Sequence, residues 1–335
     1  MGGCAPDSMQ YSVGSRSGSR LAGVTLLDDQ RFVFVTGKGG VGKTLVTVAL
    51  GAELAARGKK TLLVVSGGPS KAAHLLGVNH IQPEPHEVQP GLYAVHIEPE
   101  QAMAEYGRMV LRSQTLYDTL FDNRYVRGFF RGIPGLREWA LLGKAWFLSG
   151  GDGRGLPRRG DPPPFDVVVL DAPATGHGTD LLRVPRVIVD VAPGGRLRDD
   201  AQAAWCTLRD GRQTAVILVS LPEELPTTET LELAEVVRGE LGLPLAGLVI
   251  NMVQEPLFSV EERASLLALP PLSVPVGPEV ALYYAVRRAA SEGVQEENLR
   301  RLEAMGLPTV RFPRLPQEPS NFLDAAGLSG HFSRV

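Results

Sequence analysis

The chain has 335 residues, of which 44% are hydrophobic and 21% are charged, with a formal net charge of −3 and a pI near 6.1. This is the composition of a folded globular protein with room for one large α/β domain or two ordinary domains. The slightly acidic balance argues against nucleic acid as the main partner, because there is no basic excess to neutralise phosphates.

The cysteines and the apolar segments indicate a reducing, aqueous location. Cys4 and Cys206 are the only cysteines and lack metal-ligand spacing, so we expect neither a disulfide framework nor zinc. No apolar run approaches the ~20 residues that cross a bilayer. Residues 1–24 are rich in Gly, Ser and Arg, without the apolar core of a signal peptide. We therefore predict a flexible tail over 1–24, one domain over 25–335, no integral membrane segment and a cytoplasmic location.

Strand and helix patterns alternate from Arg31 onward. A β-rich run, Arg31–Thr36, leads through a glycine-rich turn into a helical pattern over Lys43–Arg57, and Thr61–Ser66 is the next strand. This order is a βαβ unit and predicts a parallel sheet. Further strands are predicted at Leu92–Ile97, Phe165–Asp171, Thr214–Ser220, Leu245–Asn251 and Thr309–Phe312, with a helix at Glu229–Leu241. Most of these runs are continuously apolar, which predicts a doubly wound α/β fold with helices on both faces.

Two largely helical segments interrupt this alternation. Residues of about 100–150 have a helical pattern and end in a Gly/Pro/Arg linker, Gly150–Pro164, so we interpret them as a helical subdomain inserted into the α/β domain. The second segment is Leu257–Met305. The first is unusually aromatic, with Tyr106, Tyr117, Phe121, Tyr125, Phe129, Phe130, Trp139, Trp146 and Phe147. These rings either form an apolar groove for a helical client or pack as a core.

The turn after the first strand carries a phosphate-binding pattern. It fits G-x-x-x-x-G-K-[ST] with Gly37, Lys38, Gly39, Gly40, Val41, Gly42, Lys43 and Thr44. Glycines let successive backbone N–H groups turn inward onto phosphate oxygens, and the following helix points its positive end at the same anion. Lys43 would bind the β- and γ-phosphates and Thr44 would ligate Mg²⁺. The sequence therefore predicts a P-loop NTPase that binds ATP or ADP with magnesium.

A second motif begins at Asp171, the last residue of the predicted strand Phe165–Asp171. Asp171 lies where a P-loop ATPase needs a magnesium partner, acting through a bound water. Pro173 and Gly176 would let the following chain turn over the γ-phosphate and move when it leaves, with His177 at its end. Plain structural alternatives are a helix cap for Asp171 and a satisfied loop histidine for His177.

These two motifs resemble one family. K-G-G-V-G-K-T at residues 38–44 is similar to the deviant Walker A motif, and D-A-P-A-T-G-H at 171–177 resembles the D-T-A-P-T-G-H switch II of the ArsA and tail-anchored-protein-targeting ATPases. The resemblance covers nearly the whole chain after residue 25. It implies a dimer that closes over ATP, in which Lys38 reaches the partner's nucleotide and acts with Lys43 and Asp171 in catalysis. The alternative for Lys38 is a solvated loop charge.

Weaker matches extend the resemblance toward the C-terminus. I-P-G-L-R-E at residues 133–138 resembles the family's P-G-x-x-E segment in the helical subdomain. The resemblance also implies that Asn251 contacts the adenine base and that Pro313 and Glu318, in a P-L-x-x-E-like segment, border it. A strand-end turn for Asn251 and a helix start for Glu318 are the plain alternatives.

The chain also departs from the family. Where family members have S-T-D-P-A in switch I, whose aspartate orients the attacking water, this chain has S-G-G-P-S at Ser66–Ser70 and no acid. Loss of a water-positioning group slows hydrolysis by about 10²–10⁴-fold unless another group replaces it. The zinc-binding C-x-x-C and the cysteine trio that binds arsenite are also missing, so neither zinc nor arsenite is expected.

We therefore expect a dimeric ATPase switch, formed with itself or with a related ArsA-like subunit, that couples nucleotide state to a helical subdomain and an apolar helix client. The alternative is a hydrolysis-impaired regulatory subunit of a heterodimer with a related ATPase. A partition or septum-positioning ATPase shares the P-loop but not the switch II match or the helical insertion. A metabolic kinase is disfavoured by Lys38.

Overall fold

The described residues of the protein form one mixed sheet of eight strands. The structure is a computed structural model and describes residues 27, 30–111, 135–151, 165–173, 178–192, 194–270 and 279–334. The strands are β1 (Phe32–Thr36), β2 (Thr61–Val65), β3 (His86–Gln89), β4 (Leu92–His96), β5 (Val167–Asp171), β6 (Thr214–Ser220), β7 (Leu245–Val253) and β8 (Thr309–Pro313).

The strand order, β3-β4-β2-β5-β1-β6-β7-β8, is that of a doubly wound sheet. Only β3 pairs antiparallel, with β4, and every other neighbouring pair is parallel. From β1 the chain moves to β2 on one side and later returns to β6 on the other. Ligands of doubly wound sheets bind at the carboxyl ends of the strands, at the point where the strand order reverses. The carboxyl end of β1 is therefore the expected site.

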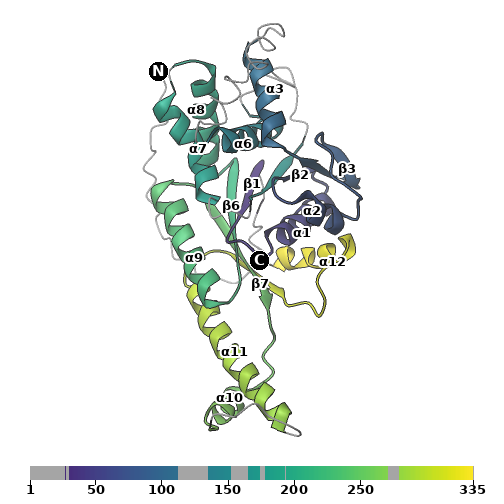
Figure 1. Cartoon of the computed structure of the whole chain (residues 1–335), viewed down its shortest axis with the longest axis vertical. Helices are drawn as coiled ribbons and strands as arrows, with labels where there is room; N and C mark the ends of the chain where they lie inside the picture. The colour runs from purple at the N-terminus through teal and green to yellow at the C-terminus, as the bar shows by residue number, and fades with distance from the viewer. Residues whose placement is uncertain are drawn as a thin grey trace, which may run out of the picture.

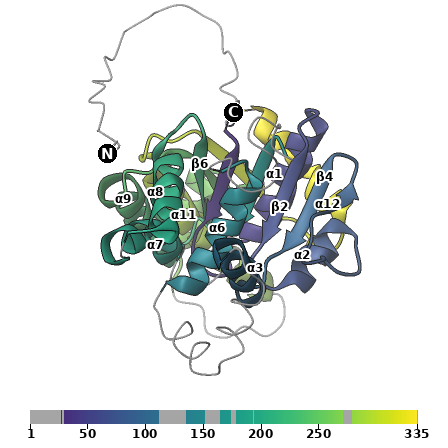
Figure 2. The same ribbon diagram turned by 90° about the horizontal axis from the view of Figure 1, so that it is seen from above.

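Helices cover both faces of this sheet. The helices of the described residues, which include two that extend beyond the sheet, are α1 (Lys43–Ala56), α2 (Pro69–Leu76), α3 (Pro99–Leu111), α6 (Leu136–Leu148), α7 (Gly178–Val191), α8 (Arg196–Arg209), α9 (Glu224–Glu235), the π-helix η1 (Val236–Glu240), α10 (Val260–Leu267), α11 (Glu279–Glu303), α12 (Phe322–Gly327) and the 3₁₀-helix η2 (Ser329–Arg334). In Figure 2, α7, α8, α9 and α11 lie together, apart from α1, α2 and α12.

The core has a layer on each side of the sheet, as β1 illustrates. Val33 and Val35 belong to the hydrophobic cluster that contains α1, α2 and α12 residues. Phe32 and Phe34 belong to the cluster on the other face, with residues of α3, α6, α7 and α8. All four side chains are fully buried. Since successive strand side chains point to opposite faces, a strand buried on both sides must be apolar throughout.

A helical arm extends away from the sheet (Figure 1). It consists of α10 and α11, and the chain enters it after β7. Its base is held by polar side chains of α11: Gln295 exchanges hydrogen bonds of 2.8 Å with the backbone of Gln254. Glu292, 3% exposed, accepts a hydrogen bond from Leu257 N at 2.8 Å. The arm is therefore tied firmly to the sheet edge from which the loops after the parallel strands also emerge.

The fold class predicted from the sequence is confirmed, and each predicted strand is present with ends that shift by a residue or two. The predicted helix at Glu229–Leu241 begins earlier, at Glu224, and its end is a π-helix. The sequence interpretation did not name β3, α7 or α8. Of the proposed subdomain at 100–150, the structure describes α3 and α6, which pack together on the sheet. Most of its aromatic residues and the tail 1–24 lie outside the described residues, so this division stays a prediction.

Candidate functional site

The phosphate loop joins β1 to α1 and depends on glycine at two positions. A Cβ on Gly37 would lie 2.2 Å from the carbonyl oxygen of Val219 on the neighbouring β6. Gly42 has a φ of 92°, and a Cβ there would lie 2.2 Å from Nδ2 of Asn251. Only glycine fits such close approaches. The first turn of α1 holds no acidic residue, so its free N–H groups face an anion without competition.

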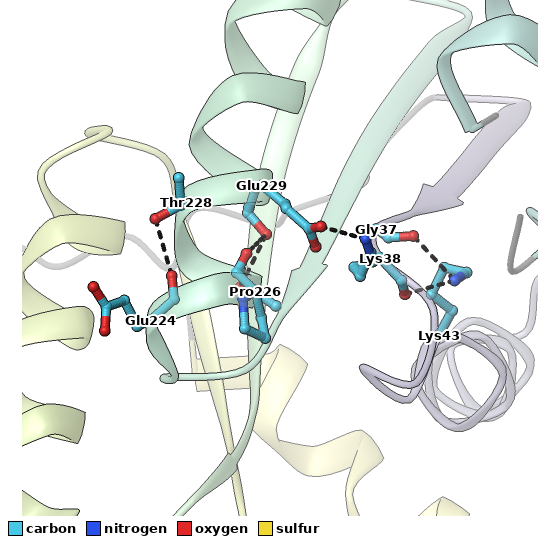
Figure 3. Close-up of polar contacts among 9 residues, drawn as sticks. Gly37, Lys38, Lys43, Glu224, Pro226, Thr228 and Glu229 are labelled. Carbon is cyan, nitrogen blue, oxygen red and sulfur yellow. Dashed lines mark hydrogen bonds and ion pairs between the residues drawn. The ribbon is translucent and has the colours of Figure 1, made fainter. Parts of the chain in front are cut away.

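Lys43 lies at the centre of this loop and is only 5% exposed. Its Nζ donates to the carbonyl oxygens of Gly37 at 3.0 Å and Lys38 at 2.9 Å (Figure 3). An ammonium group has three N–H donors, so one remains for a ligand. Burial lowers the pKa of Lys43, although the nearby charge of Asp171 acts in the opposite direction. The amine is thus held in place for an anion.

Asp171 ends β5 and is 4% exposed. Its Oδ2 accepts a hydrogen bond from the Thr44 hydroxyl at 2.7 Å, which is not the contact of a helix cap. Among the described residues Oδ1 is buried without a hydrogen-bond partner. Burial raises the pKa of Asp171 to about 6, against the opposing effects of the Thr44 hydrogen bond and the Lys43 charge. A buried carboxylate with an open oxygen beside a hydroxyl suits a hard cation such as Mg²⁺.

These oxygen ligands fit magnesium if the phosphates supply the remaining ones. Within the described part of the chain, no group of three or more His, Cys, Asp or Glu could hold a metal by itself. Mg²⁺ commonly binds through one or two protein oxygens plus substrate phosphates. Thr44 and Asp171 are therefore the residues that would hold it.

The loop after β2 lies on the other side of β5. The Ser66 hydroxyl donates to the backbone oxygen of Asp171 at 2.5 Å, so the two strand ends are joined. Gly68 is the N-cap residue of α2, with φ −51° and no side-chain cap. A Cβ on Gly67 or Gly68 would meet nothing within 4 Å. The loop therefore has space for a side chain beside the site but carries no acid.

The structure brings Asn251 to the phosphate loop. Asn251 is 2% exposed at the end of β7, and its Nδ2 donates to the carbonyl oxygen of Val41 at 2.9 Å. Its Oδ1 accepts from the backbone N–H of Met252, which has a φ of 57°. Asn251 thus supports the phosphate loop through its hydrogen bond to Val41, a role that the sequence interpretation missed. Its contact with adenine stays a prediction.

The other predicted base-contacting residues lie further along the chain. Pro313 ends β8 and is half-buried, and Glu318 is exposed in the segment that follows. Among the described residues, no hydrogen bond joins either of them to the phosphate loop. Of switch II, Pro173 follows β5 and is half-buried, whereas Gly176 and His177 lie outside the described residues.

Lys38 is paired within its own chain. Its Nζ forms a hydrogen-bonded ion pair with Oε1 of Glu229 on α9 (Figure 3). Lys38 is therefore not merely a solvated loop charge. The sequence marked Glu229 only as the first residue of a predicted helix, and nothing in the pattern around it indicated Lys38 as its partner.

The described aromatic residues of the helical region favour a core. Trp139 is 2% exposed and Trp146 is 4% exposed, and both pack against α7 and α8. The Nε1 of Trp146 donates to the Thr207 hydroxyl at 3.1 Å. Tyr117, Phe121, Tyr125, Phe129 and Phe130 lie outside the described residues, so a groove among them stays a prediction.

Comparison with known proteins agrees with this site. The family model described as anion-transporting ATPase matches residues 30–192, which include the phosphate loop and Asp171. The ATPase BagA of Mycobacterium tuberculosis (strain ATCC 25618 / H37Rv) is 32% identical over 249 residues, 71% of this chain and 69% of that protein. The chain belongs to the ArsA-like ATPase family.

Other relatives of this ArsA-like ATPase are much longer proteins. An arsenical pump-driving ATPase of Escherichia coli is 27% identical over 241 residues, 66% of this chain and 39% of that protein. The arsenical pump-driving ATPase of Acidiphilium multivorum is 27% identical over 239 residues, with the same coverage. The ArsA-like chain thus aligns with less than half of each pump-driving ATPase. None of its described helices is long and apolar enough to cross a membrane.

Proposed function

We propose that this ArsA-like chain is a Mg²⁺-dependent ATPase that works as a nucleotide-switched dimer in the cytoplasm. The observation that carries the proposal is the group formed at the glycine loop by the buried Lys43 and Asp171 with the half-buried Thr44. It combines one fixed cation, one acidic oxygen without a partner and the open amide groups of a helix N-terminus. Together these match the charges of a Mg²⁺–nucleotide complex.

Each residue of the site has a task in this proposal. The loop amides and Lys43 bind the β- and γ-phosphates and balance their charge. Bound magnesium neutralises the charge that builds up on the phosphates during transfer. Thr44 and Asp171 would hold the metal. Lys38 would add a positive charge to the nucleotide of a second subunit, either another copy or a related ArsA-like ATPase.

Hydrolysis would be slow, because Ser66–Ser70 offers no acid to orient the attacking water. This absence favours a second candidate function: a nucleotide-binding regulatory subunit in a heterodimer with a related ATPase that retains the acid. Both candidates use the same site for ATP or ADP, and both couple nucleotide state to the helical region and an apolar helix client. They differ in whether this subunit cleaves its own ATP.

Single-turnover hydrolysis of radiolabelled ATP, with mass measured by light scattering in the same sample, tests the proposal. We expect Mg²⁺-dependent ATP retention, slow cleavage and an ATP-dependent dimer. Retention of uncleaved ATP by a monomer, with cleavage only after a related subunit is added, would favour the regulatory function. Failure to bind ATP would refute both.

A further inference from the structure

An ion pair between Lys38 and Glu229 joins the phosphate loop to α9. The Lys38 side chain is 45% exposed and the Glu229 side chain 25% exposed. The second oxygen of Glu229, Oε2, is buried without a hydrogen-bond partner among the described residues. The Glu229 carboxylate thus contacts Lys38 through Oε1, whereas its Oε2 has no hydrogen bond to offset the loss of water. The Glu229 side chain is thus mostly buried, whereas the Lys38 side chain remains exposed.

The acidic partner is anchored to the sheet. Glu229 lies one residue before Thr230, whose hydroxyl donates to the Pro226 carbonyl oxygen at 2.7 Å and lies 2.9 Å from the Ser220 hydroxyl. Ser220 ends β6, the strand beside β1. The first turns of α9 are therefore fixed relative to the phosphate loop, and the Glu229 carboxylate has a defined position.

The basic partner is tied to the phosphate-binding lysine. The backbone oxygen of Lys38 accepts a hydrogen bond from Nζ of Lys43 at 2.9 Å, while its own Nζ contacts Glu229. The backbone of Lys38 is thus held in the loop, and only its side chain can turn outward. A Lys38 amine that bound the nucleotide of a second subunit could not keep its present contact with Glu229.

We propose that Glu229 is a positioning residue that holds Lys38 within its own subunit until the nucleotide of a second copy draws it away. The proposal rests on the proposed function, since it assumes that Lys38 serves a partner's ATP. Glu229 would set how much ATP and protein are needed before two copies close together. Release from Glu229 is favoured because a triphosphate carries several negative charges, whereas the carboxylate carries only one.

The size of the effect follows from exposure. A partly exposed ion pair contributes up to about 1 kcal/mol, or roughly a fivefold change in an equilibrium. A symmetric dimer requires release of the pair in both copies, so its formation would change by up to about 25-fold. High salt should reduce this difference, because exposed charges are screened.

The first experiment compares Glu229→Gln with the wild-type protein and with Glu232→Gln, a control at an exposed acid on the same helix. Dimerisation is measured by analytical ultracentrifugation in Mg²⁺–ATP at low and high salt. We expect Glu229→Gln to dimerise at about 5- to 25-fold lower protein concentration at low salt, with monomer affinity for ATP unchanged. Unchanged or weaker dimerisation, in a protein whose wild type does dimerise, would overturn the proposal.

The second experiment needs no nucleotide and separates this proposal from the proposed function. In the nucleotide-free protein, lysine side chains are acetylated with acetic anhydride. Mass spectrometry measures the acetylation rate of Lys38, with the exposed Lys71 as the internal reference. We expect Glu229→Gln to label Lys38 several-fold faster and Glu232→Gln to match the wild type. If labelling responds but ATP never produces a dimer, the proposed function fails while the pair is real. Equal Lys38 labelling in all three proteins would overturn the pair itself.

Discussion

Two loops at the carboxyl edge of the sheet, on either side of β5, differ in the functional groups that they carry. The loop after β1 uses its glycines for close approaches, Lys43 for charge and Thr44 for the contact with Asp171. The loop after β2 contributes the Ser66 hydroxyl, and its glycines face open space. The first loop combines glycines with a buried cation, as suits phosphate binding, whereas the second has no acidic residue between Ser66 and Ser70.

This difference predicts that nucleotide binding and hydrolysis are separable at this edge of the sheet. Phosphate binding depends on charges and amides that are fixed before the ligand arrives. Hydrolysis also depends on one further group placed at the attacking water. Under the proposed function, hydrolysis could be lost without a change in binding, because the two loops are connected to different strands.

Replacing Lys43 with alanine should cause the largest loss of ATP affinity. Lys43→Ala removes the buried cation that would face the phosphates, and a charged hydrogen bond of this kind contributes up to about 3 kcal/mol, or roughly a 100-fold change in affinity. Isothermal titration calorimetry with Mg²⁺–ATP measures the loss. Lys71→Ala, which removes an exposed lysine from α2, is the matched control and should bind normally. Retained affinity in Lys43→Ala would contradict the phosphate-loop assignment.

Gly42→Ala should have the next largest effect. A methyl group there would strain a φ of 92° and meet the Asn251 amide at 2.2 Å. The left-handed conformation alone costs about 1–2 kcal/mol. We expect ATP affinity to fall by roughly 30-fold and the melting temperature to drop. Gly58→Ala, also at positive φ but with open space around its Cβ, should lower stability while leaving ATP affinity intact. Similar affinity losses in both variants would mean that the Asn251 contact is irrelevant.

An acid introduced into the loop after β2 tests whether that loop limits the rate of ATP cleavage. Gly68 occupies the third position of the Ser66–Ser70 run, where the family pattern has aspartate, and its φ of −51° and open surroundings accept a side chain. We expect Gly68→Asp to raise the single-turnover rate of ATP cleavage at least about tenfold. Gly68→Asn controls for the cap, since both residues cap α2 equally well. Equal rates in the two variants would show that the missing acid does not limit turnover.

The smallest predicted effect on nucleotide affinity is a pH dependence from Asp171. Its pKa is raised to about 6 in the nucleotide-free protein, whereas bound Mg²⁺ requires the ionised form. Between pH 7.5 and 5.5 the Mg²⁺–ATP affinity should therefore fall about fourfold more in wild type than in Asp171→Asn. Equal pH dependence in the two proteins, measured by calorimetry, would rule out proton release from Asp171 on binding.

The same shift predicts a stability change with a defined sign. Because the folded-state pKa lies above the ordinary aspartate value of 3.8, protonation favours the folded state. That contribution is complete below about pH 4 and is lost as pH rises through about 6, with an upper limit near 3 kcal/mol. Urea unfolding of nucleotide-free wild type and Asp171→Asn should therefore diverge from pH 4 to 7. The asparagine variant should be the more stable at pH 7.

The sequence by itself determined the strands, the phosphate loop and the place of Asp171. Continuous apolar runs specify buried parallel strands, and the glycines with Lys43 and Thr44 specify local backbone turns and local chemistry. These are properties of neighbouring residues, so they can be read along the chain. The same reasoning missed α7, because Pro185 in its interior argues against a helix. The helix forms nonetheless, with Leu181, Leu182, Val184 and Ile188 buried against the rest of the fold.

Only the tertiary structure decided which distant residues support the loop. Asn251 lies 210 positions from Val41, and Glu229 lies 191 positions from Lys38. These contacts exist because β6 and β7 follow β1 in the sheet order, which brings the ends of all three strands to one edge. Strand order depends on how helices and strands pack as a whole, and no local pattern records it. The loop's chemistry is thus local, whereas the side chains that hold it are placed by the fold.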